Sequence, residues 1–162
     1  MSETFSAGVL LYRGSSPAVE VLLGHMGGPF WARKDAGAWT LPKGEYDPET
    51  EDAQVAAARE FAEELGLPVP EGPWTPLGAV RYRSGRNRKN LAAWAVRGEL
   101  DPAAIVPGTF DLEWPPRSGT ITAFPELDRV AWFDLATAHE KLGSGPRPLL
   151  DRLREHLQGA AD

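Results

Sequence analysis

The 162-residue sequence contains no cysteine. Disulfide bonds and thiolate metal sites are therefore excluded, and a bound metal has to be held by oxygen atoms or by a histidine. Oxygen donors favour Mg²⁺, with Mn²⁺ as a substitute. The three histidines, His25, His139 and His156, are isolated and are expected to fill the core or face solvent. The sequence has no basic segment at its start and no long apolar run, so we expect a cytoplasmic protein without a membrane partner.

Basic residues are also scarce, since 17 lysines and arginines stand against 23 aspartates and glutamates. The resulting net charge of -6 disfavours a general role in nucleic-acid binding. Five of the basic residues nevertheless lie between 81 and 89, so the sequence predicts a local cationic patch. We expect a nucleic-acid partner only in the form of a 5′-phosphorylated RNA end.

The order of sequence patterns favours the α/β class. A chain of this length can bury a sizeable core, and no linker divides it, so we predict a single domain over residues 1–162. Apolar, β-rich runs separated by turn residues predict strands, and runs without glycine or proline predict helices. The predicted strands lie at 5–12, 19–26, 39–44, 76–83, 90–97 and within 124–134, and the predicted helices at 51–65, 135–142 and 148–157.

The predicted helix at 51–65 places three glutamates close together. Gly66 and Pro68 supply its stop, and Thr50 is expected to cap its start. At about 100° of rotation per residue, the expected core face consists of Val55, Ala58, Phe61, Ala62 and Leu65. The opposite face would hold Glu60, Glu63 and Glu64, interleaved with Ala53, Ala56 and Ala57. Such a face would admit a cation with bulky anionic ligands, and the alternative is a solvated acidic surface.

Residues 44–67 together resemble the signature of the Nudix hydrolases. Gly44 is followed by the isolated Glu51 and, after seven further residues, by the run REFAEELGL, which begins at Arg59. One position departs from the signature, because six residues and not five separate Gly44 from Glu51. The additional residue falls in the loop EYDPET, so the spacing from Glu51 to Glu64 is preserved.

The resemblance implies the Nudix fold, a mixed β-sheet sandwiched between helices (α/β/α). It also implies a metal site formed by the carbonyl oxygen of Gly44 and by the three glutamates of the helix, Glu60, Glu63 and Glu64. In that arrangement Arg59 would hold the Glu63 carboxylate. Glu51 would fix the start of the helix without binding metal.

Two further contributions follow from the resemblance. The lead-in WTLPKG is similar to that of family members that act on dinucleoside polyphosphates, which implies phosphate contact by Lys43; a loop lysine in water is the alternative. Family members commonly recruit one more glutamate from a distant loop, and the long irregular stretch 98–124 suggests Glu113 for this role. Glu126 and Glu99 follow as second and third choices. The general base is left open among Glu113 and the helix residues Glu60 and Glu64.

The predicted hairpin at 76–97 carries the cationic patch. In a strand, Arg81 and Arg83 would point to one face and Tyr82 to the other. The two guanidinium groups suit a polyphosphate, and we count Tyr82 with them as substrate-binding. The alternative is an edge strand that its charges protect from aggregation. The remaining basic residues, Arg86, Arg88 and Lys89, are expected in solvent.

The sequence thus predicts an Mg²⁺-dependent hydrolase that cleaves a pyrophosphate linkage in a nucleoside diphosphate derivative. A dinucleoside polyphosphate or a nucleoside triphosphate is the expected substrate. Triphosphorylated RNA, damaged nucleotides and inositol pyrophosphates stay open. The alternative from another class is a Nudix-like nucleotide-binding or regulatory module without turnover.

Overall fold

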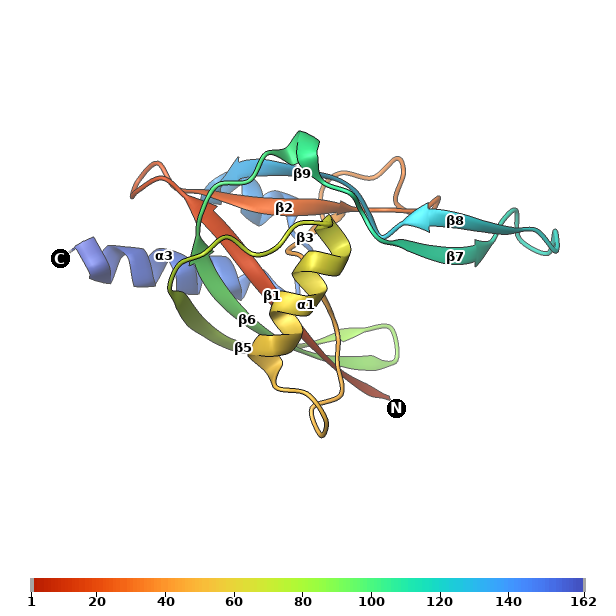
Figure 1. Cartoon of the computed structure of the whole chain (residues 1–162), viewed down its shortest axis with the longest axis horizontal. Helices are drawn as coiled ribbons and strands as arrows, with labels where there is room; N and C mark the ends of the chain where they lie inside the picture. Colours follow the sequence, from red (N-terminus) through yellow and green to blue (C-terminus); the bar gives the residue numbers. More distant parts are fainter. Residues whose placement is uncertain (1, 162) are drawn as a thin grey trace.

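A mixed, seven-stranded sheet forms the centre of the computed structural model, which describes residues 2–161 (Figure 1). Its strands are β1 (Glu3–Arg13), β2 (Glu20–Met26), β3 (Trp39–Thr40), β4 (Lys43–Glu45), β5 (Trp74–Ser84), β6 (Asn87–Arg97) and β9 (Leu127–Asp134). The strand order is β3-β2-β1-β6-β5, with β4 paired to β1 and β9 paired to β2. The pair β1 and β6 is parallel and the others are antiparallel. The predicted strands are confirmed, except that the one predicted at 39–44 is divided into β3, which pairs with β2, and β4, which pairs with β1.

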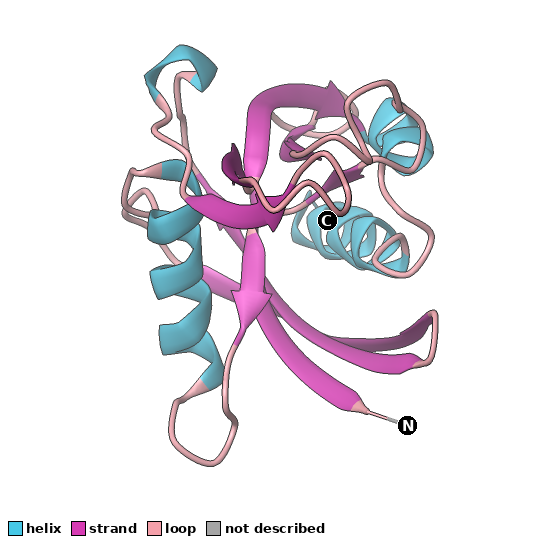
Figure 2. Ribbon diagram, turned by 90° about the vertical axis from the view of Figure 1, so that its right-hand side faces the viewer, coloured by secondary structure: helices cyan, strands magenta, loops and turns pink. Residues whose placement is uncertain are grey.

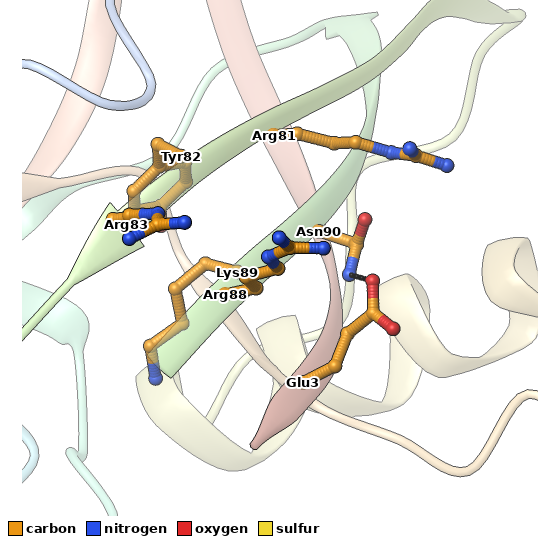
Figure 3. A pocket seen from close by; sticks show the side chains of 7 residues that line it. All are labelled: Glu3, Arg81, Tyr82, Arg83, Arg88, Lys89 and Asn90. Atoms are coloured by element: carbon orange, nitrogen blue, oxygen red, sulfur yellow. Dashed lines mark hydrogen bonds between the residues drawn. The ribbon is translucent and has the colours of Figure 1, made fainter. Parts of the chain in front are cut away.

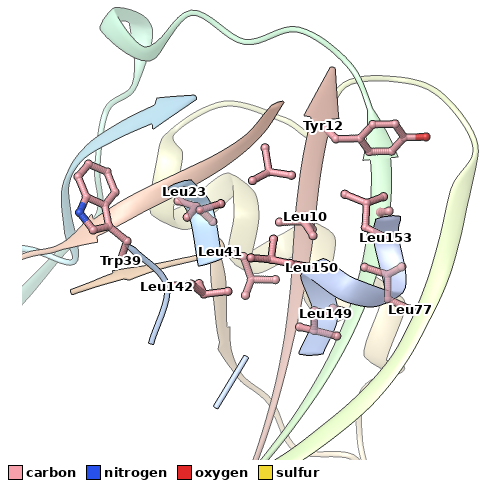
Figure 4. Packing of buried hydrophobic residues seen from close by; sticks show 14 of the residues in the cluster. Leu10, Tyr12, Leu23, Trp39, Leu41, Leu77, Leu142, Leu149, Leu150 and Leu153 are labelled. Atoms are coloured by element: carbon pink, nitrogen blue, oxygen red, sulfur yellow. The ribbon is translucent and has the colours of Figure 1, made fainter. Parts of the chain in front are cut away.

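Helices cover both faces of the sheet, as the α/β class requires (Figure 2). One face is covered by α1 (Ala53–Leu65), and the other by α2 (Leu135–Lys141) and α3 (Pro148–Ala161). Strand β1 lies between two cores. Its residues Ala7, Val9 and Leu11 pack on the α1 side, whereas Leu10 and Tyr12 pack with the α3 leucines (Figure 4). The central part of the strand, residues 7–12, lacks charged side chains because both of its faces are buried there.

Helix α1 begins three residues after the residue expected to cap it. Asp52 has extended backbone angles, and its carboxylate accepts hydrogen bonds from the amides of Gln54 (3.1 Å) and Val55 (3.3 Å). The prediction that Thr50 caps the helix is therefore wrong. The predicted stop is confirmed, since Gly66 takes a left-handed conformation with φ of 68°.

The buried face of α1 is rotated relative to the predicted one. Phe61 and Leu65 are fully buried as expected, but so are Ala56 and Ala57, which were predicted on the glutamate face. Val55, predicted in the core, is 59% exposed. Small side chains let the helix approach the sheet closely. Because Glu64 follows Ala57 by seven residues, it shares the face that turns toward the sheet.

Two further strands, β7 (Thr109–Glu113) and β8 (Ile121–Pro125), form a hairpin that projects from the sheet (Figure 1). A short 3-10 helix, η1 (Pro102–Ala104), precedes it. The sequence predicted a long irregular stretch here, and the structure instead has a hairpin. In β7, Phe110 and Leu112 are half-buried and Asp111 is exposed.

The loop between β2 and β3 is fastened to the sheet by His25. Its ring is fully buried, with Nδ1 3.0 Å from an Asp128 carboxylate oxygen and Nε2 2.7 Å from the Lys34 carbonyl oxygen. This agrees with the expectation of a core histidine. In the same loop Trp31 packs against the core and Phe30 is exposed.

None of the helices in the described part of the chain has the length and apolar character needed to span a membrane.

The cap of α1 gives a test of the helix start. Asp52→Ala removes the acceptor for two backbone amides and should destabilise the protein by about 1 kcal/mol. Thr50→Ala is the matched control, because its hydroxyl makes only one long hydrogen bond (3.4 Å), to the carbonyl of Asp47. Urea denaturation of both variants measures the difference. An equal loss in the two variants would contradict the assignment of Asp52.

Candidate active site

A cavity of about 550 Å³, here called the carboxylate pocket, opens between α1, β4 and the base of the β7–β8 hairpin. It collects the glutamates of the helix from one side and residues of the hairpin base from the other. Its lining residues are Ser6, Lys43, Gly44, Glu45, Glu60, Glu63, Glu64, Lys89, Gly108, Thr109 and Glu126.

Strand β4 determines which glutamates enter this pocket. It pairs with β1 in the register Ala7 to Gly44, which places it beside α1. The contact is close: a Cβ atom on Gly44 would lie 1.9 Å from an Oε atom of Glu60. The neighbouring amide of Lys43 donates a hydrogen bond to Glu64 (3.3 Å). A side chain at position 44 would displace the Glu60 carboxylate, which lies against the backbone of Gly44.

Arg59 organises the outer edge of the pocket. Its guanidinium donates two hydrogen bonds of 2.8 Å to Glu51, one of 2.7 Å to Glu60, and longer ones of 3.3 Å to Glu63. The hydrogen bonds from Arg59 hold the pKa of Glu51 below its usual value. Those to Glu51 raise the pKa of Arg59. Arg59 thus holds Glu51 and Glu60 more closely than Glu63, the partner expected from the sequence.

The loop between Gly44 and Glu51, which is one residue longer than in the Nudix signature, contains a tight turn at Asp47. The carbonyl oxygen of Asp47 accepts hydrogen bonds from the amides of Thr50 (3.1 Å) and Glu51 (3.0 Å). Its carboxylate accepts one from Glu49 (3.0 Å). The turn returns the chain so that Glu51 meets Arg59, and the helix keeps its place.

Burial dominates the electrostatics of the inner carboxylates. It raises the pKa of Glu64 to about 8, even though Lys43 opposes the shift. Burial also raises the pKa of Glu60, and it lowers the pKa of Lys43. A carboxylate in such a place either keeps a proton near neutral pH or needs a cation at its side.

The donors of the pocket suit a hard divalent cation. The acidic side chains and the backbone carbonyl of Gly44 offer only oxygen atoms, and the Glu60 carboxylate lies directly against Gly44. Within residues 2–161, however, no three acidic or histidine side chains converge tightly enough to hold an ion as they stand. Glu60 is turned toward Arg59 and Glu64 toward the Lys43 amide. A cation would have to compete with these two contacts.

The additional glutamate comes from a different place than the one predicted first. Glu113 lies near the tip of the hairpin, outside the pocket, with its carboxylate 3.5 Å from the Gly119 amide. Glu99 is paired with Arg13 at 2.9 Å. Glu126, the second choice, lines the pocket. The sequence offered three exposed acids without any sign that the stretch folds into a hairpin, whose base alone reaches the site.

The cationic patch divides between the two faces of the β5–β6 hairpin. Tyr82 pairs with Lys89 across the strands, and Lys89 lines the carboxylate pocket although it was expected in solvent. Arg81 does not line that pocket, and Arg83 does not either. The two-residue turn after Ser84 sets this register, and it was the signal that could have identified Lys89.

A second cavity of about 350 Å³, here called the aromatic pocket, adjoins the first. The two cavities share Lys43 and Lys89. The other lining residues of the aromatic pocket are Met26, Trp31, Gly37, Trp39, Thr40, Tyr82, Arg83, Ser84, Gly143, Ser144, Gly145 and Pro146. Two lysines therefore stand between a wall of carboxylates and a group of aromatic rings.

Comparison with known proteins agrees with this architecture. The family model described as NUDIX domain matches residues 3–153, so the chain belongs to the Nudix family. Members of this family are typically pyrophosphohydrolases, generally depend on divalent metals, and bind small molecules derived from nucleotides. The predicted family and fold are confirmed.

Solved structures show the same fold at low sequence identity. A C. elegans Ap4A hydrolase in a binary complex is similar with a TM-score of 0.64 and 22% identity, over 96% of this chain and 98% of that chain. The MutT protein from Methanosarcina mazei Go1 is similar with a TM-score of 0.64 and 20% identity, over 96% of this chain and 95% of that chain. The NUDIX domain of Shewanella oneidensis NrtR, complexed with ADP ribose, is similar with a TM-score of 0.64 and 17% identity, over 97% of this chain and 90% of that chain. No curated protein matches the chain.

The raised pKa of Glu64 predicts opposite effects of pH on the metal-free and metal-bound protein. Between pH 4.5 and about 8 the folded protein keeps a proton that the unfolded chain releases. Without metal, stability should therefore fall as pH rises through this window. Mg²⁺ has to displace the same proton, so the rise in Tm that it causes should be larger at pH 8.5 than at pH 6.

Glu64→Gln should abolish both pH effects in thermal denaturation, whereas Glu155→Gln on the exposed surface of α3 should retain them. Identical Mg²⁺-induced shifts at the two pH values in the unsubstituted protein would disprove the role given to Glu64.

Proposed function

We propose that this protein hydrolyses a phosphoric anhydride in a nucleoside diphosphate derivative, with the help of Mg²⁺ held in the carboxylate pocket. The observation that carries the proposal is the buried Glu64, which lies beside Lys43 in a pocket that two lysines connect to a group of aromatic side chains. A solvated acidic face would not bury a glutamate there.

The metal would be held by the carbonyl oxygen of Gly44 and the carboxylates of Glu60 and Glu64, with Glu63 near the pocket mouth. When bound, it would neutralise the phosphate oxygens and lower the pKa of a water molecule. Arg59 keeps Glu60 oriented, and Glu51 anchors Arg59 in turn. Glu113 and Glu99 have no part in this arrangement.

Glu126 accepts the proton of the attacking water in this proposal. It lines the pocket from the hairpin base, opposite the helix that supplies the other carboxylates. Among the described residues its carboxylate makes no hydrogen bond or ion pair, so it is free to act as a base. Glu60 and Glu64, the alternatives named from the sequence, are engaged by Arg59 and by the Lys43 amide.

The nucleoside would lie in the aromatic pocket and its phosphate chain across the two lysines. Tyr82 and Trp31 offer ring faces or edges for a base, and Lys43 with Lys89 offers point charges to the phosphates. Arg83 lies beside the same pocket and can contact the polyphosphate. A dinucleoside polyphosphate or a nucleoside triphosphate satisfies these features, and the fold shared with an Ap4A hydrolase supports the choice.

A panel of substrates tests the reaction class. We expect Mg²⁺-dependent release of product from a dinucleoside polyphosphate or a nucleoside triphosphate, followed by chromatography. Mn²⁺ should support the reaction as well. The competing function is a nucleotide-binding or regulatory module. Tight binding of these compounds in calorimetry, without any release of product, would favour this competing function.

Substitutions of single glutamates test the assigned roles. Glu64→Gln should abolish turnover, and Glu126→Gln should lower kcat by about 10²-fold, the usual contribution of a general base. Glu113→Gln is the matched control, because it lies outside the pocket, and its kcat should stay within about twofold of the unsubstituted value. A large loss in Glu113→Gln together with normal turnover in Glu126→Gln would reverse the assignment.

A further inference from the structure

A third cavity of about 240 Å³ lies on the β5–β6 hairpin and is lined mainly by cationic side chains (Figure 3). We call it the arginine pocket. It is formed by Arg81, Arg83, Arg88, Lys89, Asn90 and Glu3, with Tyr82 at its side. Three arginines and one lysine thus line a cavity that contains a single carboxylate.

The strand register gathers the arginines on one face of the hairpin. Arg83 lies directly opposite Arg88, and Arg81 lies opposite Asn90. Antiparallel neighbours in such pairs project to the same side of the sheet. This face continues into the α1 side of the sheet, because Asn90 is in register with Phe5 of β1. Tyr82 and Lys89 form a pair on the opposite face, toward α3.

Within residues 2–161 the three arginines of this cluster have no charged partner, whereas Lys89 forms an ion pair with Glu45 at 3.8 Å. Arg81, Arg83 and Arg88 make no ion pair there, and their side chains make no hydrogen bond there. The carboxylate of Glu3 is instead held by the side-chain amide of Asn90 at 3.0 Å. Like charges directly opposite each other destabilise a strand pair.

The chemistry of the cluster suits phosphate. Guanidinium groups bind phosphate oxygens through paired hydrogen bonds, and two of them on adjacent strands can grip one phosphate from both sides. The cavity of about 240 Å³ has room for a phosphate or diphosphate group. Lys89 lines both this cavity and the carboxylate pocket, so one extended ligand can reach from one to the other.

We propose that the arginine pocket binds a second phosphate of the substrate, a phosphate ester outside the anhydride that is cleaved. This inference deepens the proposed function and rests on it for the identity of the ligand. The favoured substrates therefore carry a phosphate ester in addition to the polyphosphate. It can be a phosphate on the ribose of a nucleotide or the first phosphodiester of a 5′-triphosphorylated RNA.

Binding of inorganic pyrophosphate in EDTA tests the pocket separately from catalysis. Without metal the carboxylate pocket repels anions, so calorimetry in 0.1 M NaCl should report the arginine pocket. We expect one binding site in the unsubstituted protein and at least a tenfold loss of affinity in Arg81→Ala/Arg88→Ala. Arg86→Ala is the matched control, since this exposed arginine on the same hairpin does not line the pocket. Absence of binding, or equal losses in the control, would overturn the proposal.

The substrate preference gives the second measurement. We compare kcat/KM for ATP, for ATP with an added 3′-phosphate, and for a 5′-triphosphorylated dinucleotide. The unsubstituted protein should prefer at least one of the two phosphate esters to ATP, and the double variant should reduce that preference about tenfold. Which ester is preferred identifies the source of the phosphate. An unchanged preference would overturn the proposal.

Failure of the two proposals can be told apart. If no compound is hydrolysed but pyrophosphate still binds and the double variant abolishes binding, the proposed function fails and the arginine pocket stands. If ATP is hydrolysed with Mg²⁺ but pyrophosphate does not bind in EDTA, the arginine pocket fails and the proposed function stands.

Discussion

The close contact between α1 and β4 at Gly44 is the constraint on which the site depends. Because the residue has no side chain, the Glu60 carboxylate lies against the backbone of the strand, and the next amide reaches Glu64. The alanines on the same helix face allow this approach. Glu60 and Glu64 are consequently withdrawn in part from water, and this burial raises the pKa of both carboxyl groups.

Most of the architecture could be predicted from the sequence, because strand and helix patterns were long and clearly bounded. The same holds for the Glu60, Glu63 and Glu64 cluster, whose spacing places it on one helix. The cap and the buried face could not be predicted. Alanine is compatible with either face, so composition alone did not show that Ala56 and Ala57 support the contact with the sheet.

Contributions from distant segments were harder to predict than those of the helix. Glu113 and Glu126 look alike in sequence, and only the β7–β8 pairing shows that the first is far from the site. Lys89 and Arg88 are neighbours, yet the pleat sends them to opposite faces of the hairpin. One cationic stretch of sequence thereby contributes to two surfaces, one at the aromatic pocket and one on the α1 side of the sheet.

The turn at Asp47 has a consequence for how this chain can vary. Arg59 clamps Glu51 with two short hydrogen bonds, so the helix start is positioned by that clamp and not by the number of residues leading to it. The additional length of the loop is accommodated by a local turn, in which the amides of Thr50 and Glu51 donate hydrogen bonds to the carbonyl oxygen of Asp47. Insertions or deletions at this point would alter the outline of the loop and leave the spacing of the glutamates on α1 unchanged.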